Sequence, residues 1–305
     1  MITRLVDSAG LRMSAVRVGV VGLIVLAAAG TGYETSSAES SSAAHGRSYA
    51  SHVGAAHSAS KSSVGLIDKK GKIVVNSKTY AIYWGKPTEF PADVQPGVTA
   101  LLTGLNRSSY LATIDEYMRG KRATSQYVRS FVDVSRPPTT DPTPQVILAE
   151  VRKVLRQASV KADPNAVYLV FSSNLPKVDY CAWHAAGDVS GVQTQIAYVP
   201  NTSGTGTCYR PTDFPNISSY SFGTRSIVDN AAHELLEAMT DPIPGTSWVD
   251  SHFQEIGDKC DFVYTSAVPL SGRGNVWQLQ AQWSNRSNSC IQLASAKHGE
   301  SPTPR

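Results

Sequence analysis

The sequence predicts a single domain of mixed α/β (α+β) class, with a mixed sheet, a central helix and a disulfide-stabilised C-terminal half. Short runs of β-branched and aromatic residues alternate along the chain with stretches of helical periodicity. The chain has 305 residues, which is enough to bury the core of one large domain. All four cysteines lie in the C-terminal half, where an even number suggests disulfide bonds.

Each element has its own signal. Three short apolar runs suit buried strands, and they are Thr79–Trp84, Ala166–Ser172 and Gln195–Val199. Apolar residues recur at helical spacing in Gln145–Arg156, after a start that contains two prolines. Two shorter helices are expected at Val98–Leu105 and Tyr110–Met118. Near the end of the chain, apolar residues alternate with glutamines over Trp277–Trp283, which is the period of a half-buried strand.

The first 29 residues have the order of a secretory signal peptide. Arg4, Arg12 and Arg17 precede an apolar run at 18–26, which three alanines follow. The apolar run is too short for a comfortable membrane span, and a retained signal anchor is the alternative. We therefore expect a signal peptide at residues 1–29 and a secreted, extracellular protein with no membrane span once the signal is removed.

Composition divides the rest of the chain. Residues 30–62 are rich in serine, alanine and glycine, so we expect a disordered linker that does not join the core. A globular domain is expected at 63–294 and a disordered tail at 295–305. Removal of the signal would lower the formal net charge from +4 to about +2, because the signal carries three arginines and one aspartate. Without a basic stripe the sequence argues against nucleic acid binding, and we expect a monomer.

The most informative stretch is 230–242, where a helix would place one histidine and several acids on one side. At about 100° per residue, the polar and apolar side chains of this helix occupy opposite faces. The polar face consists of Asn230, His233, Glu234, Glu237 and Asp241. We expect the helix to begin at Ser226, whose hydroxyl would cap it while Asp229 completes a capping box. The polar face would then line a cleft.

The spacing of His233, Glu234 and Glu237 copies the His-Glu-x-x-His arrangement of zinc hydrolases, with a glutamate in place of the second histidine. Side chains four residues apart on a helix can reach one ion together, so His233 and Glu237 are candidate metal ligands. Glu234 would be the catalytic general base that deprotonates a metal-bound water. Glu255 is the preferred third ligand, and Asp258 would either orient His233 or replace Glu255.

Other interpretations stay open at this site. His233 and Glu237 could form only a hydrogen-bonded pair on a solvated helix face. His184 could be a catalytic donor to the substrate or transition state, or a structural histidine bonded to the backbone. His252 could replace Glu255 as a ligand.

The four cysteines allow three connectivities. Sequence order favours Cys181 with Cys208 and Cys260 with Cys290, because this pairing closes the shortest loops. A four-cysteine zinc site is the alternative, but the spacing lacks any Cys-x-x-Cys pair. A disulfide at Cys260 would hold the segment Glu255–Asp258 in place for metal binding.

Four segments together resemble the EXORDIUM-like, phosphate-induced protein 1 family of secreted proteins, in order and spacing across residues 65–293. The segments are Tyr80–Gly85, Tyr180–His184, His233–Pro242 and Glu255–Cys260. The resemblance implies a secreted α/β domain with a zincin-like motif, and it says little about the substrate. The family usually carries asparagine where this chain has Asp241, which implies that Asp241 braces the turn and does not bind metal.

An ion held by one histidine and two glutamates would be formally neutral. This lowers its Lewis acidity and makes hydrolysis at neutral pH less assured. Zinc is the expected divalent metal, and the oxygen-rich ligand set also tolerates manganese or calcium. One predicted function is a secreted metal-dependent hydrolase, metallopeptidase-like, with a peptide or cell-wall substrate. The other is a non-catalytic extracellular or cell-wall-associated binding or signalling protein, with a structural metal or no metal.

Overall fold

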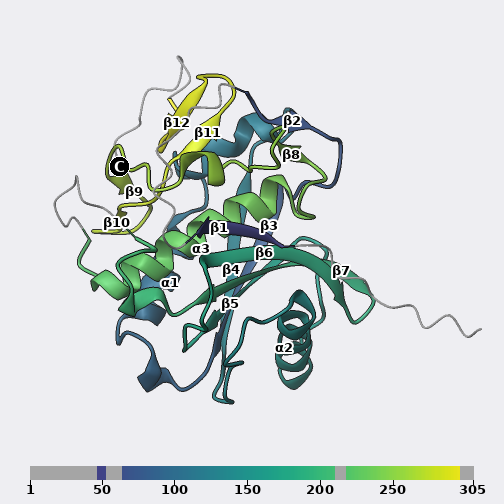
Figure 1. Cartoon of the computed structure of the whole chain (residues 1–305), viewed down its shortest axis with the longest axis vertical. Coiled ribbons are helices and arrows are strands. Elements are labelled where there is room, and N and C mark those ends of the chain that lie inside the picture. Colours follow the sequence, from purple (N-terminus) through teal and green to yellow (C-terminus); the bar gives the residue numbers. More distant parts are fainter. Residues whose placement is uncertain (1–46, 53–63, 210–217, 296–305) are drawn as a thin grey trace, which may run out of the picture. The chain divides into compact units, whose positions relative to one another are not determined.

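The computed structural model describes residues 47–52, 64–209 and 218–295 (Figure 1). Within these ranges the protein is of mixed α/β class with a mixed sheet, as predicted. The expected signal peptide and all but the first residue of the expected C-terminal tail lie outside the described residues. No helix in the described ranges is long and apolar enough to cross a membrane.

A six-stranded sheet forms the centre of the fold, with the strand order β1-β6-β7-β5-β3-β4. The strands are β1 (Ser48–His52), β3 (Asn76–Trp84), β4 (Thr124–Asp133), β5 (Ala166–Ser172), β6 (Tyr180–Val189) and β7 (Val192–Pro200). The strands β7, β5, β3 and β4 are parallel, whereas β6 pairs antiparallel with β7 and β1 pairs antiparallel with β6. Parallel strands covered on both faces read as continuous apolar runs, which is why the sequence predicts β3, β5 and β7 well.

Neighbouring residues of β5 enter two different cores. Leu169 packs in the core that contains α1 (Val94–Gly104) and α3 (Phe222–Thr240). The next residue, Val170, packs in the core that contains α2 (Pro144–Gln157). Figure 1 shows α3 and α2 on opposite faces of the sheet. Because both faces are covered, every residue of β5 is buried.

The first three helical segments lie close to their predicted positions. α2 extends one residue beyond the expected helix at each end. α1 begins four residues before the expected start, because Pro96 lies in its first turn, where a missing N–H is tolerated. The expected helix at Tyr110–Met118 is the 3-10 helix η2 (Leu111–Tyr117).

The predicted start of the motif helix was wrong. α3 begins at Phe222, and the Ser221 hydroxyl caps it by accepting a hydrogen bond from the Thr224 amide at 3.3 Å. Asp93, which precedes α1, accepts hydrogen bonds from the Ser221 amide at 2.6 Å and from its hydroxyl at 2.7 Å. The expected cap, Ser226, lies inside the helix. A contact between residues 128 positions apart supports the true cap, so local sequence could not show it.

The expected half-buried strand at 277–283 was also wrong. Its ends belong to two separate short strands, β10 (Val276–Trp277) and β11 (Gln282–Ser284). The alternating glutamines Gln278, Gln280 and Gln282 are buried. A polar residue in an alternating pattern usually faces water, but these glutamines face other parts of the protein.

The remaining elements are short. They are β2 (Ile67–Asp68), β8 (Trp248–Val249), β9 (Val268–Pro269), β12 (Ser289–Ile291), η1 (Pro87–Glu89), η3 (Thr202–Gly204) and η4 (Asp258–Cys260). β2 pairs with β8, β9 with β10, and β11 with β12.

Part of the expected linker joins the sheet. β1 lies inside the segment 30–62 and pairs along the free edge of β6, with Ser48 opposite His184. The segment was expected to be a linker, whereas its residues 48–52 form a strand of the sheet. A strand can join a sheet edge through main-chain hydrogen bonds alone, so a composition poor in large apolar residues did not reveal it.

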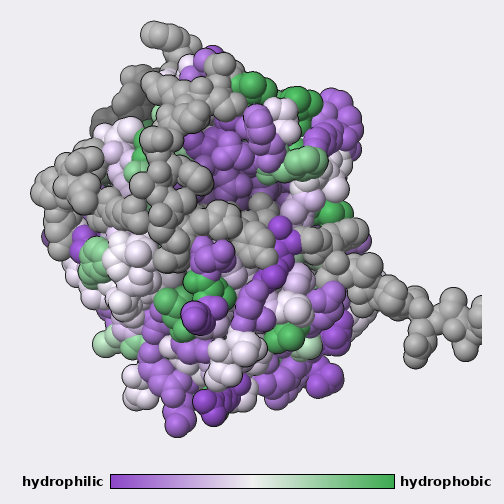
Figure 2. Space-filling model, viewed as in Figure 1, coloured by the Kyte–Doolittle hydropathy of each residue, from purple (hydrophilic) through white to green (hydrophobic). Residues whose placement is uncertain are grey.

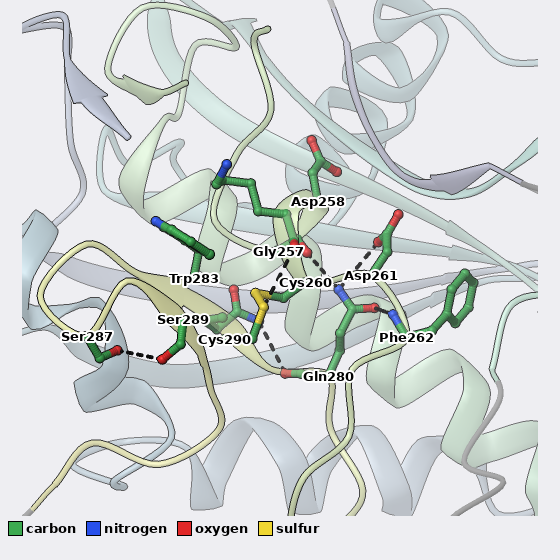
Figure 3. Close-up of a disulfide and its surroundings, with 12 residues drawn as sticks. Gly257, Asp258, Cys260, Asp261, Phe262, Gln280, Trp283, Ser287, Ser289 and Cys290 are labelled. Atoms are coloured by element: carbon green, nitrogen blue, oxygen red, sulfur yellow. Dashed lines mark hydrogen bonds between the residues drawn. A yellow bond between two sulfur atoms is a disulfide. The ribbon is translucent and has the colours of Figure 1, made fainter. Parts of the chain in front are cut away.

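Both predicted disulfides are present. The Cα atoms are 5.4 Å apart in Cys181–Cys208 and 5.7 Å apart in Cys260–Cys290. Figure 3 shows the second bond beneath the turn that carries Asp258, whose side chain points away from the sulfur atoms. The disulfide therefore ties the η4 turn to β12 without occupying the side of the turn that Asp258 faces.

Candidate metal centre

Polar side chains from α3, β6 and the turn before η4 meet at one buried cluster. Their exposed fractions are 0% for His184, 2% for His233, 0% for Glu234, 0% for Glu237 and 1% for Glu255. Asp258 is the most open member, with 16% of its side chain exposed. Carboxylates at this depth are costly unless hydrogen bonds or a cation compensate them.

Two groups of side chains within the described residues could hold a metal ion. The first is His184, Glu237 and Glu255, and all three are buried. The second is His233, Glu237 and Asp258. In each group, one ligand atom per residue lies within 4.8 Å of the others. The predicted set of His233, Glu237 and Glu255 is not one of these groups, because Glu255 lies with His184 instead of His233.

His184 has one ring nitrogen held by a carboxylate and the other directed at oxygens. Its Nδ1 lies 3.0 Å from Glu234 Oε2, and its Nε2 lies 3.2 Å from the Asp241 carbonyl oxygen and 3.6 Å from Glu255 Oε1. A histidine whose Nδ1–H donates to a carboxylate presents Nε2 to a metal in many metal sites. His184 has this arrangement, and its Nε2–H donates to the Asp241 carbonyl, so a bound ion would take the place of that proton.

Glu237 has one oxygen occupied and one without a partner. Its Oε1 accepts hydrogen bonds from the amides of Gly257 at 3.0 Å and Asp258 at 3.1 Å, and it lies 3.1 Å from His233 Nε2. Its Oε2 is buried, has no hydrogen-bond partner among the described residues, and lies 3.7 Å from His184 Nδ1. Buried carboxylate oxygens are rarely left without a partner. A cation beside His184 would satisfy Oε2.

The separations in the first group suit an ion. In a tetrahedral site with metal–ligand distances of about 2.1 Å, neighbouring ligand atoms are about 3.4 Å apart. The 3.6 Å between His184 Nε2 and Glu255 Oε1 is too long for a hydrogen bond and close to this spacing. The Asp241 carbonyl oxygen, at 3.2 Å from Nε2, is within reach as a further oxygen ligand.

His233 is held differently from His184. The Gln280 side-chain amide donates to His233 Nδ1 at 2.8 Å and to the Gly257 carbonyl at 3.0 Å, while Gln280 Oε1 accepts from the Phe262 amide. The amide orientation is therefore determined, with the Gln280 nitrogen against Nδ1 and the His233 Nε2 facing Glu237 Oε1. His233 is thus suited to orient Glu237, and Gln280 is a site residue that the sequence did not indicate.

Charge governs the protonation of the cluster. Burial alone would lower the pKa of His184, but its hydrogen bond with Glu234 and the charges of Glu234 and Glu237 raise it. Burial also opposes a proton on His233, yet the charge of Glu237 and the contact with Asp258 raise its pKa well above the usual value. Burial raises the pKa of Glu234 to about 7, although its bond with His184 acts in the opposite direction. The cluster attracts positive charge, whether protons or a metal ion.

Two other predictions for this region have clear outcomes. Asp241 accepts hydrogen bonds from the amides of Gly245, Thr246 and Ser247 at 2.5, 3.1 and 2.6 Å, so its carboxylate braces the turn after α3. His252 is exposed and belongs to neither group, so it does not replace Glu255.

Figure 2 shows a recess lined by hydrophilic side chains in the upper half of the face drawn in Figure 1.

Comparison with known proteins adds no identification. A scan against protein-family models gives no match, and a search of curated proteins gives no match. The resemblance to the EXORDIUM-like family therefore stays a prediction from the sequence.

Proposed function

We propose that the protein is a metal-dependent hydrolase that holds one divalent ion on His184 Nε2, Glu237 Oε2 and Glu255. The observation that carries the proposal is Glu237 Oε2, which is buried without a hydrogen-bond partner in the described chain and belongs to the same ligand group as His184 and Glu255. The mixed histidine and carboxylate set fits zinc first and tolerates manganese. This ligand set differs from the one predicted, because His184 takes the place of His233.

The bound ion would supply Lewis acidity that polarises a carbonyl group and acidifies a bound water. Glu234 is proposed as the general base, and the hydrogen bond between its Oε2 and His184 Nδ1 holds its carboxylate against the histidine ligand. Glu237 is oriented by His233 and by two backbone amides on its Oε1. These contacts fix both side chains before any substrate binds.

We also propose that the protein acts outside the cell as a zincin-like member of the EXORDIUM-like family. Two disulfides support an oxidising compartment. The helical spacing of Glu234 and Glu237 on α3 supports the zincin-like motif, from which the chain departs because His233 is outside the proposed ligand group. A peptide or cell-wall polymer is the proposed substrate.

A second candidate is a non-catalytic extracellular binding protein with a structural ion. The observation that favours it is burial, since the three side chains of the first ligand group are at most 1% exposed. An ion there would join α3, β6 and the segment before η4, as structural metals do.

Glu234→Gln tests the catalytic proposal. We expect the variant to keep wild-type zinc stoichiometry by elemental analysis and to lose turnover about a hundredfold or more, because a general base contributes on that order. His184→Gln should lose the zinc itself. The exposed His252→Ala is the matched control and should keep both metal and turnover.

Three outcomes would contradict parts of the proposal. Glu234→Gln with turnover close to wild type excludes Glu234 as the base. Wild-type protein that binds zinc but turns over no peptide or ester substrate on broad panels favours the structural ion. Protein that binds no divalent metal contradicts both candidates.

A further inference from the structure

The edge of the sheet next to the ion site is occupied by the chain's own N-terminal segment. β1 pairs antiparallel with β6 through four residue pairs, from Ser48 with His184 to His52 with Tyr180. Residues directly opposite each other in such a pair have Cα atoms about 5 Å apart. A main chain lying on this edge therefore passes beside the residue that we propose as an ion ligand.

A pocket for a positively charged side chain lies at the start of the paired segment. The Arg47 guanidinium donates to Asp141 Oδ1 at 2.8 Å and to the Pro142 carbonyl at 3.2 Å. Its Cζ lies 5.4 Å from the centroid of the Trp183 ring, within the range of a cation–π contact. The pocket thus offers a carboxylate, a carbonyl and an aromatic face to one cation.

The pocket is built into the fold. The Tyr180 hydroxyl donates to the same Asp141 Oδ1 at 2.5 Å, which orients the carboxylate. Trp183 is fully buried and Tyr180 is 2% exposed, and both belong to β6. Asp141 keeps 41% of its side chain exposed, so a basic side chain from solution can reach it. The fold itself holds these three side chains together.

We propose that the edge of β6, together with Asp141 and Trp183, is a docking site for an extended peptide that carries a basic residue. β1 occupies this site as a built-in ligand, and Arg47 fills the pocket. Main-chain hydrogen bonds to the sheet edge would supply affinity, and the pocket would supply selectivity for arginine or lysine. The inference rests on the proposed function and names its substrate class, because the main chain of a peptide docked on this edge runs beside His184.

The test uses the full chain in three forms: wild type, Arg47→Ala, and Arg47→Ala with Asp141→Ala. A fluorescent peptide with the sequence of residues 47–52, Arg-Ser-Tyr-Ala-Ser-His, is titrated and followed by anisotropy, beside the same peptide with alanine in the first position. We expect Arg47→Ala to bind the arginine peptide about tenfold or more tightly than the alanine peptide. Wild type should bind far more weakly because its own strand competes, and Asp141→Ala should remove the preference.

A matched control lies on the opposite edge of the sheet. Arg129 of β4 also stacks on an aromatic ring, with its Cζ 4.8 Å from the Phe131 centroid, so Arg129→Ala should behave as wild type. Hydrogen exchange of the β6 amides shows whether Arg47→Ala has loosened β1. Deletion of residues 47–52 is a second variant that removes the strand outright.

The proposal is overturned if neither Arg47→Ala nor the deletion binds the arginine peptide, or if both peptides bind equally. β1 would then be a permanent strand of the sheet. Failure of the docking-site proposal can be distinguished from failure of the proposed function. Selective peptide binding without hydrolysis keeps the docking site and removes the hydrolase, whereas turnover that Arg47 and Asp141 do not affect keeps the hydrolase and removes the docking site.

Discussion

Gly257 is the residue that allows the turn before η4 to touch α3. A Cβ at this position would lie 2.6 Å from His233 Cε1, 2.7 Å from His233 Nδ1 and 2.9 Å from Glu237 Oε1. Real Cβ atoms essentially never come closer than 3.0 Å to such neighbours. The absence of a side chain is therefore what lets the Gly257 amide reach Glu237 Oε1.

Gly257→Ala should weaken the metal centre. We expect zinc affinity to fall about tenfold or more, as happens when groups that orient ligands are disturbed, and stability to fall by about 1–3 kcal/mol from overpacking. Competition with a zinc chelator measures the zinc affinity, and thermal unfolding measures the stability. Gly204→Ala is the control, because nothing lies within 4 Å of its Cβ position. Equal zinc affinity in Gly257→Ala and wild type would contradict the role of this contact.

The two histidines also show what a residue pattern can and cannot indicate. The His-Glu-x-x-Glu spacing predicted that His233 and Glu237 lie one turn apart on a helix, and they do. The role of each histidine depends on the partner of its Nδ1, which is Glu234 for His184 and the Gln280 amide for His233. These partners come from other elements, so the spacing alone pointed to His233 as the ligand.

At the scale of elements, the two disulfides stabilise different segments of the candidate metal centre. Cys260–Cys290 holds the η4 turn, which contributes Asp258, and Figure 3 shows Gln280 reaching Gly257 beside it. Cys181–Cys208 ties β6, which β7 already holds in the sheet. The η4 turn belongs to none of the strand pairs in the described part of the chain, so its position depends more on the disulfide.

Removing each disulfide by paired Cys→Ser substitution separates stability from metal binding. The loops span 27 and 30 residues, so each loss should cost a similar amount, about 3–4 kcal/mol by chain entropy. We expect zinc affinity to fall much more without Cys260–Cys290 than without Cys181–Cys208. Denaturant unfolding measures the loss of stability in each variant, and zinc titration measures the loss of zinc affinity. Similar losses of zinc affinity in both variants would show that the η4 turn is not selectively dependent on its disulfide.

At the scale of the whole molecule, a second buried acid makes stability depend on pH. Glu150 on α2 is 3% exposed, and burial and a hydrogen bond with Asp133 raise its pKa from 4.5 to about 7. Burial opposes ionisation of Asp133, but hydrogen bonds with Glu150 and Lys153 hold the pKa of its carboxyl below the usual value. The folded protein therefore keeps a proton on Glu150 that the unfolded chain releases near pH 4.5.

Because the folded state binds more protons in this range, the contribution of Glu150 to stability is present below pH 4.5 and is lost as the pH rises to about 7. Glu150→Gln removes this loss while its amide can still donate to Asp133. We expect the variant to match wild type near pH 5 and to exceed it at pH 8 by on the order of 1–3 kcal/mol. Thermal unfolding from pH 5 to 8, with chelator present, measures the difference.

Glu89→Gln serves as the control for this pH series. Hydrogen bonds from Ser173 and the Lys86 amide hold the pKa of Glu89 below its usual value, so its titration lies below pH 5 and the profile from pH 5 to 8 should keep its wild-type slope. A Glu150→Gln profile parallel to wild type would show that Glu150 does not carry the pH dependence.

Local residue patterns are sufficient to predict the strands β3, β5 and β7, the helix α2 and the pairing of the cysteines. Their signals are local: continuous apolar runs, helical spacing of apolar residues, and short loops between cysteines. The sequence also placed Glu234 and Glu237 on a helix that approaches Asp258. Three features become visible only in the folded chain: His184 faces Glu255, Gln280 is buried against His233, and β1 joins the sheet. Each of these depends on contacts between segments distant in the chain, which leave no periodic pattern in the residues that make them.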